Sequence, residues 1–553
     1  MIRRQVLDSL SFVITKYLND KGICCDFNFN LSVPPKNINA DFATNAAMLI
    51  AKKIKMSPII IADELIKVIL KDVSDIIEDA KISGNGFINL FVKNRIIYNV
   101  LKKIIIEKNR YGNMSKKNSN EKILIEFVSA NPTGPLHIGH GRGAAIGDSL
   151  ARILKHLGYN VTKEYYLNDA GNQITTLVES IRIRYKQIAG EKIDFPTNYY
   201  HGEYITDIAK KLFFYYKNIN EIDFKYEAMN NILKIIKNDL KDFSVEFDNW
   251  FSESKLAVTK NKNKITKVDE ICKYLFVKNE AYIKNKALWL SSTKFGDTKD
   301  RVLRRSNGKY TYFASDIAYH KDKFERGFTK FINLWGADHH GYVARIKACI
   351  NMLGFNSDKL NIVLYQLVYL TKKGKSAIMS KRSGEFVTLK EIINEIGKDA
   401  CRFFFLLRDP NSLLEFDLEL AKKRSNENPV FYVQYVWVRC KSIIDECRNR
   451  KNIIYDIDRI NFFLLNTKEE RNLIKKLSAF CSTLEISEKN MKPHYFTAYL
   501  IELADIYHRF YEKCRVLTND RELTSARIKL VEAVMVIIKN GLNLLGVSVP
   551  NKM

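Results

Sequence analysis

The sequence predicts an α/β protein in which a nucleotide-binding parallel-sheet domain follows a small α/β domain and precedes an all-α domain. Three observations support this. A buried strand, a Gly/Pro loop and a long helical pattern follow one another over 123–158, which is how a nucleotide-binding α/β domain begins. A polar, turn-rich run at 109–121 reads as a linker. After Asp409-Pro410 the apolar residues recur at helical spacing with few glycines.

The charge balance favours a polyanionic partner. Among 553 residues, 89 Lys and Arg stand against 62 Asp and Glu, a net charge of +27. Such an excess repels itself in a compact protein and is typical of nucleic-acid binding. The alternative is compositional drift, because Lys and Asn are abundant everywhere. An apolar fraction of 46% excludes a mostly disordered chain.

Cysteine usage predicts a reducing, cytoplasmic location. The nine cysteines are scattered and form no Cys-x-x-Cys pair, which argues against a disulfide framework and a thiolate zinc site. The first twenty residues read as an amphipathic helix and not as a signal peptide. No stretch is long and apolar enough for a membrane span, so we expect no membrane partner.

The elements divide among three predicted domains. An N-terminal α/β domain includes the apolar run Gly86–Val92. The central domain has strand candidates at Ile123–Val128, Lys330–Trp335 and Ile362–Leu370, joined by helices as in a parallel sheet. The predicted boundaries are 1–112, 121–410 with a Lys-rich helical insertion over about 170–300, and 415–553.

The first motif with chemical content is His137-Ile138-Gly139-His140, at the start of the long helix. Two histidines three residues apart point to the same side of a helix. The helix N-terminus offers free N–H groups and a positive dipole to a phosphate. Imidazole donors there can stabilise charge that develops on a phosphoryl group.

The second motif is Ile378-Met379-Ser380-Lys381-Arg382-Ser383-Gly384, just beyond a strand candidate. A lysine on a glycine-flanked loop can reach a leaving pyrophosphate as a point charge. The alternative interpretation is a solvated basic turn.

Together the two motifs resemble the signatures of class I aminoacyl-tRNA synthetases, and the rest of the chain is similar to bacterial-type arginyl-tRNA synthetases. The supporting motifs run in order over most of the chain. They are Glu126-Phe-Val-Ser-Ala-Asn131-Pro-Thr-Gly-Pro-Leu-His137, Tyr166-Leu-Asn-Asp169-Ala-Gly171-Asn-Gln173, Val245-Glu-Phe-Asp248-Asn-Trp250-Phe-Ser-Glu253, Tyr312-Phe-Ala-Ser-Asp316-Ile-Ala-Tyr319, Trp335-Gly-Ala-Asp338-His-His340-Gly, Asn428-Pro-Val-Phe-Tyr-Val-Gln-Tyr435 and Leu545-Gly-Val-Ser-Val-Pro550.

The resemblance implies a Rossmann-type catalytic domain of class I that ligates L-arginine to tRNA(Arg) through an arginyl-adenylate. ATP is expected as a substrate with Mg²⁺, and we expect a monomer with no structural metal. By resemblance His137, His140 and Lys381 are catalytic. The residues that the resemblance assigns to ATP are Pro132, Thr133, Gly134, Pro135, Leu136, His137, Ile138, Gly139, His140, Asp338, His339, Met379, Ser380 and Lys381.

Arginine recognition needs a carboxylate, because the planar guanidinium pairs with one in bidentate geometry. Asp316 is the first choice, with Tyr312 one helical turn earlier. The alternative is that Asp316 is a surface carboxylate paired with Lys321 or Lys323. The residues assigned to arginine are Glu126, Ser129, Ala130, Asn131, His137, Tyr312 and Asp316.

Asp338-His339-His340 also occurs in metal-dependent phosphoesterases. No further histidines fall at a repeated ligand spacing, so an adenosine contact is favoured over a metal site. In the helical domain, Tyr435, Trp437 and Arg439 are predicted to contact tRNA by stacking on splayed bases. Packing in the helix core is the alternative for each aromatic side chain there.

Two departures from the family pattern concern Ile378, where a lysine is usual, and Val436-Trp437-Val438, which replace small and histidine residues. Two rival functions stay open at this point. One is a class I synthetase for another amino acid, such as cysteine or glutamine, and the other is a non-catalytic tRNA-binding paralogue.

Overall fold

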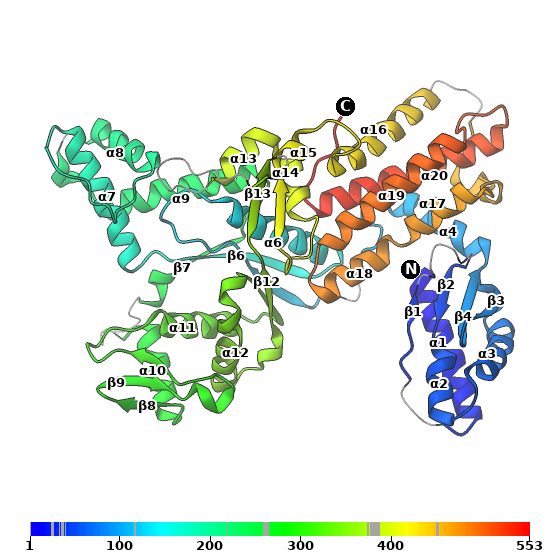
Figure 1. The fold of residues 1–553 in the computed structure, drawn as a ribbon, viewed down its shortest axis with the longest axis horizontal. Coiled ribbons are helices and arrows are strands. Elements are labelled where there is room, and N and C mark those ends of the chain that lie inside the picture. The colour runs from blue at the N-terminus through cyan, green and yellow to red at the C-terminus, as the bar shows by residue number, and fades with distance from the viewer. Residues whose placement is uncertain are drawn as a thin grey trace.

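In the computed structural model, the chain forms a middle domain built on a parallel sheet, an N-terminal domain and a helical C-terminal domain (Figure 1). The N-terminal domain lies beside the C-terminal helices at one end, and α7 (Asn172–Ile188) and α8 (Glu203–Tyr215) project at the opposite end. The structure describes residues 2–23, 27–32, 34, 38, 40–114, 118–216, 218–257, 265–372, 375–376, 387–448 and 453–553.

The N-terminal domain is an antiparallel sheet of four strands in the order β1-β2-β4-β3, covered by helices. The apolar run predicted as a strand forms β4. The last helix, α4, packs against α17 (Lys468–Ser478) and α20 (Arg521–Leu544) of the C-terminal domain. Tyr98 on α4 donates a hydrogen bond to the carbonyl of Leu465 (2.9 Å). The elements are α1 (Ile2–Asp20), β1 (Leu31–Ser32), β2 (Phe42–Thr44), α2 (Ala46–Ile54), α3 (Pro58–Asp72), β3 (Ile77–Ser83), β4 (Phe87–Val92) and α4 (Asn94–Glu107).

The central domain is built on five parallel strands in the order β12-β11-β5-β6-β7. The chain leaves β5 through α6 to β6 on one side, whereas β11 pairs on the other side of β5. In parallel sheets, ligands bind at such a switch point, beyond the carboxyl ends of the strands. The elements are β5 (Lys122–Glu126), α6 (Ile138–His156), β6 (Asn160–Leu167), β7 (Asn249–Ser252), α11 (Tyr312–Glu325), β11 (Lys330–Gly336), α12 (Val343–Met352) and β12 (Leu360–Tyr365).

Glycines let α6 lie close to the sheet. A Cβ atom on Gly147 would stand 2.3 Å from the ring of Phe127, and one on Gly143 would stand 2.7 Å from the hydroxyl of Tyr365. Both distances are too short for any larger residue without a shift of its neighbours. These glycines therefore set the position of the helix whose first turn carries His137 and His140.

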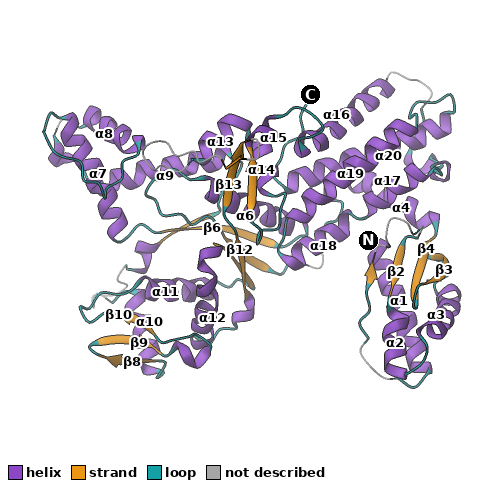
Figure 2. Cartoon of the chain, in the orientation of Figure 1, coloured by secondary structure: helices purple, strands orange, loops and turns teal. Residues whose placement is uncertain are grey.

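The helical insertion predicted over about 170–300 is found in the first half of that range, whereas the second half also contains strands. Helices α7 (Asn172–Ile188), α8 (Glu203–Tyr215) and α9 (Phe224–Asp242) lie between β6 and β7. Beyond β7 come a helix and an antiparallel sheet of three strands (Figure 2). Its hairpin turns at Asn285-Lys286, both at positive φ, a turn that lacks the glycine by which such hairpins are usually recognised. These elements are α10 (Lys267–Val277), β8 (Ala281–Lys284), β9 (Ala287–Leu290) and β10 (Arg301–Arg304).

The single strand predicted at Ile362–Leu370 is also corrected, because it divides into β12 and β13 in two different sheets. The break falls at Gln366, whose N–H donates to the carbonyl of Pro410 (2.9 Å). The carbonyl of Gln366 accepts from the buried guanidinium of Arg142 (2.7 Å). Gln366 therefore forms its backbone hydrogen bonds with Pro410 and Arg142, which are distant in sequence, instead of with a neighbouring strand. The small second sheet comprises β13 (Val368–Lys372), β14 (Lys375–Ser376) and β15 (Leu414–Asp417).

The C-terminal domain is helical, as predicted, apart from β15 at its start. Helix α20 is buried along most of its length and packs against α16, α17 and α4. None of the helices within the described ranges is long and apolar enough to cross a membrane. The helices from the second sheet onward are α13 (Leu389–Ile396), α14 (Lys398–Phe405), α15 (Leu418–Lys422), α16 (Pro429–Arg448), α17 (Lys468–Ser478), α18 (Phe480–Asn490), α19 (His494–Lys513) and α20 (Arg521–Leu544).

Candidate active site

The loop after β5 turns sharply at the switch point. Val128 and Ser129 both have left-handed backbones, with φ of 66° and 42°, which is strained for residues other than glycine. The Ser129 hydroxyl donates to Glu126 Oε1 (3.0 Å) and accepts from the N–H of Tyr166 (3.1 Å). The strained turn therefore ties the carboxyl ends of β5 and β6 together beside a buried carboxylate.

His137 and His140 form one stacked pair at the mouth of α6. Their ring centroids lie 3.6 Å apart with planes inclined by 22°. The His137 Nδ1 atom accepts from the N–H groups of Gly139 (3.1 Å) and His140 (3.4 Å), and His140 Nδ1 accepts from the N–H of His137 (3.3 Å). The pair thus caps the helix by itself.

The capping fixes the protonation of both rings. Because each Nδ1 accepts a hydrogen bond, the proton of each neutral ring lies on Nε2. Burial lowers the pKa of His137, and burial together with His137 lowers the pKa of His140 to about 3. Near neutral pH both rings are therefore uncharged N–H donors at the positive end of a helix, an arrangement suited to phosphate oxygens.

Met379, Ser380 and Lys381, predicted to bind ATP, lie outside the described residues, as does Ile378. The described chain on either side locates the ends of this segment. On one side β14 ends at Ser376. On the other, the carbonyl of Val387 accepts from the N–H of Ile138 (3.1 Å), and the N–H of Leu389 donates to the carbonyl of Leu136 (2.7 Å). The chain that follows Lys381 is thus bonded to the start of α6.

Asp316 lies on α11 and faces the same switch point. Its carboxylate accepts a hydrogen bond from the Tyr342 hydroxyl. The alternative pairing is wrong, since Lys321 pairs with Glu325 and Lys323 pairs with Glu126. Burial, with the nearby charges of Glu253 and Glu126, raises the pKa of Asp316 to about 7. A carboxylate held this way favours a cationic ligand.

Glu253 is a functional candidate that the sequence reasoning missed. It follows β7 directly, is 9% exposed and acts electrostatically on Asp316. Burial raises its pKa as well, while hydrogen bonds with Ser315 and Tyr166 oppose the rise. Its position at the carboxyl end of a strand could have identified it, but that strand was interpreted as helix.

The remaining predicted site residues differ in how far they are exposed to solvent. Tyr312 is 61% exposed, with its hydroxyl near Gly171. Asp338 and His339 are exposed just beyond β11, with His339 Nε2 3.5 Å from Asp338 Oδ2. Ala130 and Leu136 bury their side chains in the core, so only their backbones can meet a ligand. Asn131 is exposed, Pro132 is buried, and Thr133, Gly134, Pro135 and Ile138 are half-buried in the loop and first turn.

No group of three or more His, Cys, Asp or Glu side chains in the described ranges is arranged to hold a metal ion. The Asp338-His339-His340 triplet thus gathers no further ligands there. Any Mg²⁺ that accompanies ATP would be held largely by phosphate oxygens and water, as is usual for this ion.

The three predicted tRNA contacts do not share one face of α16. The Arg439 guanidinium lies over the rings of Tyr435 (5.0 Å) and Tyr511 (4.6 Å). Trp437 instead lies under Lys539 of α20 (5.8 Å). Tyr435 and Arg439 therefore form one half-buried aromatic and cationic surface with Tyr511 of α19. Trp437 lies on a different side of α16, against α20.

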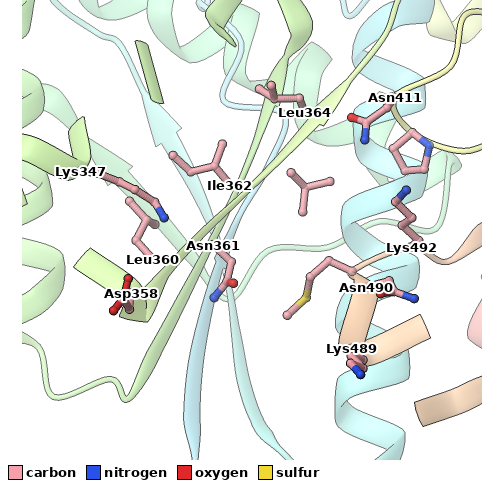
Figure 3. Close-up of a pocket in the computed structure, with 13 residues that line it drawn as sticks. Lys347, Asp358, Leu360, Asn361, Ile362, Leu364, Asn411, Lys489, Asn490 and Lys492 are labelled. Atoms are coloured by element: carbon pink, nitrogen blue, oxygen red, sulfur yellow. The ribbon is translucent and has the colours of Figure 1, made fainter. Parts of the chain in front are cut away.

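A cleft of about 580 Å³ lies where the central domain meets the C-terminal helices (Figure 3). It is bounded by the edge strand β12 and the turn between α18 and α19. None of its lining residues belongs to the predicted ATP or arginine sites. The polar side chains in its wall are Lys347, Asp358, Asn361, Asn411, Lys489, Asn490 and Lys492.

Comparison with known families assigns most of the chain in three parts. Residues 8–92 match the arginyl tRNA synthetase N terminal domain. Residues 100–415 match the class I (R) tRNA synthetase catalytic domain, and residues 433–553 match the DALR anticodon binding domain.

Full-length relatives agree with this assignment. The chain is 46% identical over 536 residues to an arginine–tRNA ligase of Citrifermentans bemidjiense, covering 95% of each. It is 43% identical to an arginine–tRNA ligase of Caldanaerobacter subterraneus over the whole of both chains. The Thermus thermophilus arginyl-tRNA synthetase structure superposes over both full chains with a TM-score of 0.76 at 19% identity, which shows a shared fold.

Proposed function

Because the chain belongs to the arginyl-tRNA synthetases of class I, we propose that the site between β5, β6 and β11 binds arginine and ATP with the residue roles given below. The enzyme ligates L-arginine to tRNA(Arg) at the expense of ATP. The relatives are arginine–tRNA ligases over their full length, which disfavours a synthetase for another amino acid. The single observation that carries the site assignment is the stacked, neutral histidine pair at the N-terminus of α6, which begins at the switch point of the parallel sheet.

The residues at this site are suited to the activation of arginine by ATP. The α-carboxylate oxygen of arginine attacks the α-phosphorus of ATP, a P–O bond forms, and the bond to pyrophosphate breaks. The Nε2–H groups of His137 and His140 donate to phosphate oxygens where negative charge develops. Asp316 and Glu253 bind the guanidinium. Glu126 and Ser129 face the amino-acid α-groups, and Asn131, Tyr312, Asp338 and His339 border the same edge of the sheet.

In the second step a ribose hydroxyl at the 3′ end of tRNA attacks the activated carbonyl carbon, an ester bond forms and AMP leaves. Positioning of the two substrates supplies most of this step. The anticodon domain and the N-terminal domain supply tRNA contacts, and the Tyr435–Arg439 surface is the part of α16 suited to stacking on bases. We infer a cytoplasmic location, in keeping with the buried thiols of Cys272, Cys349 and Cys401, which form no disulfide. The monomeric state and the use of Mg²⁺ stay predictions.

Replacing Lys381 with alanine is expected to lower the rate of adenylate formation by about 10²- to 10³-fold, because a positive charge on the leaving pyrophosphate is lost. Arginine-dependent ATP–pyrophosphate exchange, measured with tRNA present, tests this. Affinity for tRNA should stay near that of the parent enzyme. Lys390→Ala is the matched control, since Lys390 follows the same segment but is paired with Asp242. Unchanged exchange in Lys381→Ala would remove the proposed role.

The cleft of Figure 3 is expected to contact the tRNA backbone. Its wall holds three lysines and one aspartate; Lys492 is paired with Asp409, whereas Lys347 and Lys489 have no ion pair within the described ranges. The double variant Lys347→Ala/Lys489→Ala should weaken tRNA binding and reduce the slope of log K against log salt by up to about 2. Filter binding at several salt concentrations measures both. Lys321→Ala, which removes a lysine paired with Glu325, should leave the slope unchanged, and an equal slope in the double variant would exclude the contact.

A further inference from the structure

A buried ammonium lies under the proposed arginine site. Lys323 is 1% exposed, and its Nζ atom donates to Glu126 Oε2 and to Asn333 Oδ1 (2.8 Å). The Tyr319 hydroxyl lies 3.1 Å from Glu126 Oε2 and 2.7 Å from Glu164 Oε1. Lysine side chains are rarely buried unless they are paired. Because this one is buried, its charge acts on the neighbouring carboxylates and not on the surface of the protein.

The same ammonium is connected to the guanidinium end of the site. Asn333 donates to His320 Nε2 (3.2 Å), and His320 Nδ1 donates to the carbonyl of Asp316 (2.8 Å). Burial lowers the pKa of His320 to about 4, so this ring is a neutral connector. A continuous polar chain therefore runs from Glu126 through Lys323 to the backbone of Asp316.

The charges around the site can be counted. Glu126, Asp316 and Glu253 contribute three negative charges when ionised, and Lys323 contributes one positive charge, which leaves two net negative charges. Glu164 is excluded from this count because Arg326 binds it through two nitrogens (2.5 and 2.8 Å). Asp169, at the outer rim, accepts hydrogen bonds from Ser252 and Ser254, and its negative charge acts on Glu253; the count therefore covers only the charges that act on Asp316 and Asp316 itself. Arginine brings two cationic groups, its guanidinium and its α-ammonium.

We propose that Lys323 is a positioning residue that sets the charge of the arginine pocket, so that the pocket matches the two cationic groups of the substrate and keeps Asp316 ionised for the guanidinium. This inference rests on the proposed placement of arginine at Glu126 and Asp316. Without the ammonium, three carboxylates would crowd one buried site, and one of them would take up a proton. This proton uptake raises the pH at which Asp316 ionises, because burial already raises its pKa to about 7 and Lys323 opposes the rise.

Every element around Asp316 contributes to this balance. The groups that face it are Glu126 from β5, Tyr166 from β6, Glu253 after β7, Tyr342 after β11, Cys349 from α12, and Lys323 and His320 from its own helix. Burial raises the pKa values of the tyrosines and of Cys349, so they stay neutral near pH 7. Arg345 of α12 lies over the Tyr342 ring (5.0 Å) but is paired with Asp297 (3.4 Å), so Lys323 is the cation that is paired with a carboxylate of this set.

The test is Lys323→Met, which keeps the length of the side chain and removes its charge. The affinity for arginine at pH 7 should fall by about fivefold, because a midpoint that moves from about 7 to about 8 lowers the ionised fraction of Asp316 from about one half to about one tenth. The pH at which arginine affinity reaches half of its plateau should move upward by about one pH unit. Discrimination against citrulline, a ureido analogue of similar shape without the charge, should fall as well.

Two further variants separate charge from structure. Lys321→Met removes a lysine from the same helix at an exposed position paired with Glu325 and should leave the pH midpoint unchanged. Lys323→Met/Glu126→Gln removes both partners, restores two net negative charges and should return the midpoint close to that of the parent, even where Lys323→Met alone folds poorly. An unmoved midpoint in Lys323→Met, or no return in the double variant, would overturn the proposal. Failure of the proposed function is distinct, because the parent enzyme would then bind no arginine.

Discussion

Asp316→Asn is expected to raise the KM for arginine by about 10²- to 10³-fold, because truncating a buried charged partner typically costs roughly 2–5 kcal/mol. The substitution keeps the shape of the side chain and its hydrogen bond from Tyr342 but removes the negative charge. Initial rates of aminoacylation against arginine concentration measure the change. The KM for ATP should stay within about twofold, since Asp316 has no proposed contact with the nucleotide.

The pH dependence gives the same substitution a second readout. Burial raises the pKa of Asp316 to about 7 in the empty site, and a bound guanidinium requires the ionised form. Arginine affinity should therefore rise with pH through about 7 and level off above it, with a proton released on binding below that pH. Calorimetric titrations in buffers of different ionisation enthalpy detect the proton. In Asp316→Asn the dependence should disappear.

Glu325→Gln is the matched control for this prediction. Glu325 lies on the same helix, is exposed and pairs with Lys321, so its loss removes one negative charge without touching the pocket. Its KM for arginine should equal that of the parent. Equal arginine affinity in Asp316→Asn and Glu325→Gln would place the guanidinium elsewhere.

His137→Asn is expected to lower the rate of arginine activation by about 10²- to 10³-fold, the usual cost of losing one donor to developing transition-state charge. His137 both caps α6 through Nδ1 and presents Nε2 as a donor. Asparagine can accept at the cap position but cannot reproduce the second role. ATP–pyrophosphate exchange in the presence of tRNA measures the loss.

His137→Ala provides the comparison that separates capping from catalysis. It removes both roles, so its activity should fall as far as that of His137→Asn, while its unfolding free energy should fall by a further ~1 kcal/mol. Denaturant unfolding of the two variants measures this difference. Full activity in His137→Asn would show that the imidazole acts only as a helix cap.

Sequence patterns within short segments correctly predicted the structural features that depend mainly on neighbouring residues. The strand, loop and helix over 123–158, the helical C-terminal domain and the histidine pair at a helix N-terminus all follow from periodicity and turn residues within one short segment. The family resemblance rested on motifs of the same kind and is confirmed. Two local interpretations were wrong, at β8 to β10 and at Gln366. In the first the turn lacked its usual glycine, and in the second distant residues supplied the hydrogen bonds.

By itself, then, the sequence determined the class of fold and the family, and it predicted the histidine pair at the start of α6, because those signals lie in contiguous segments. Only the tertiary structure decided which carboxylates meet. Glu126, Glu253 and Asp316 come from three elements far apart in the chain, and the parallel sheet brings them to one edge. The choice of Lys323 as partner of Glu126, and the neutral state of both histidines, depend on burial. Burial depends on the packing of the whole domain, and no local pattern specifies it.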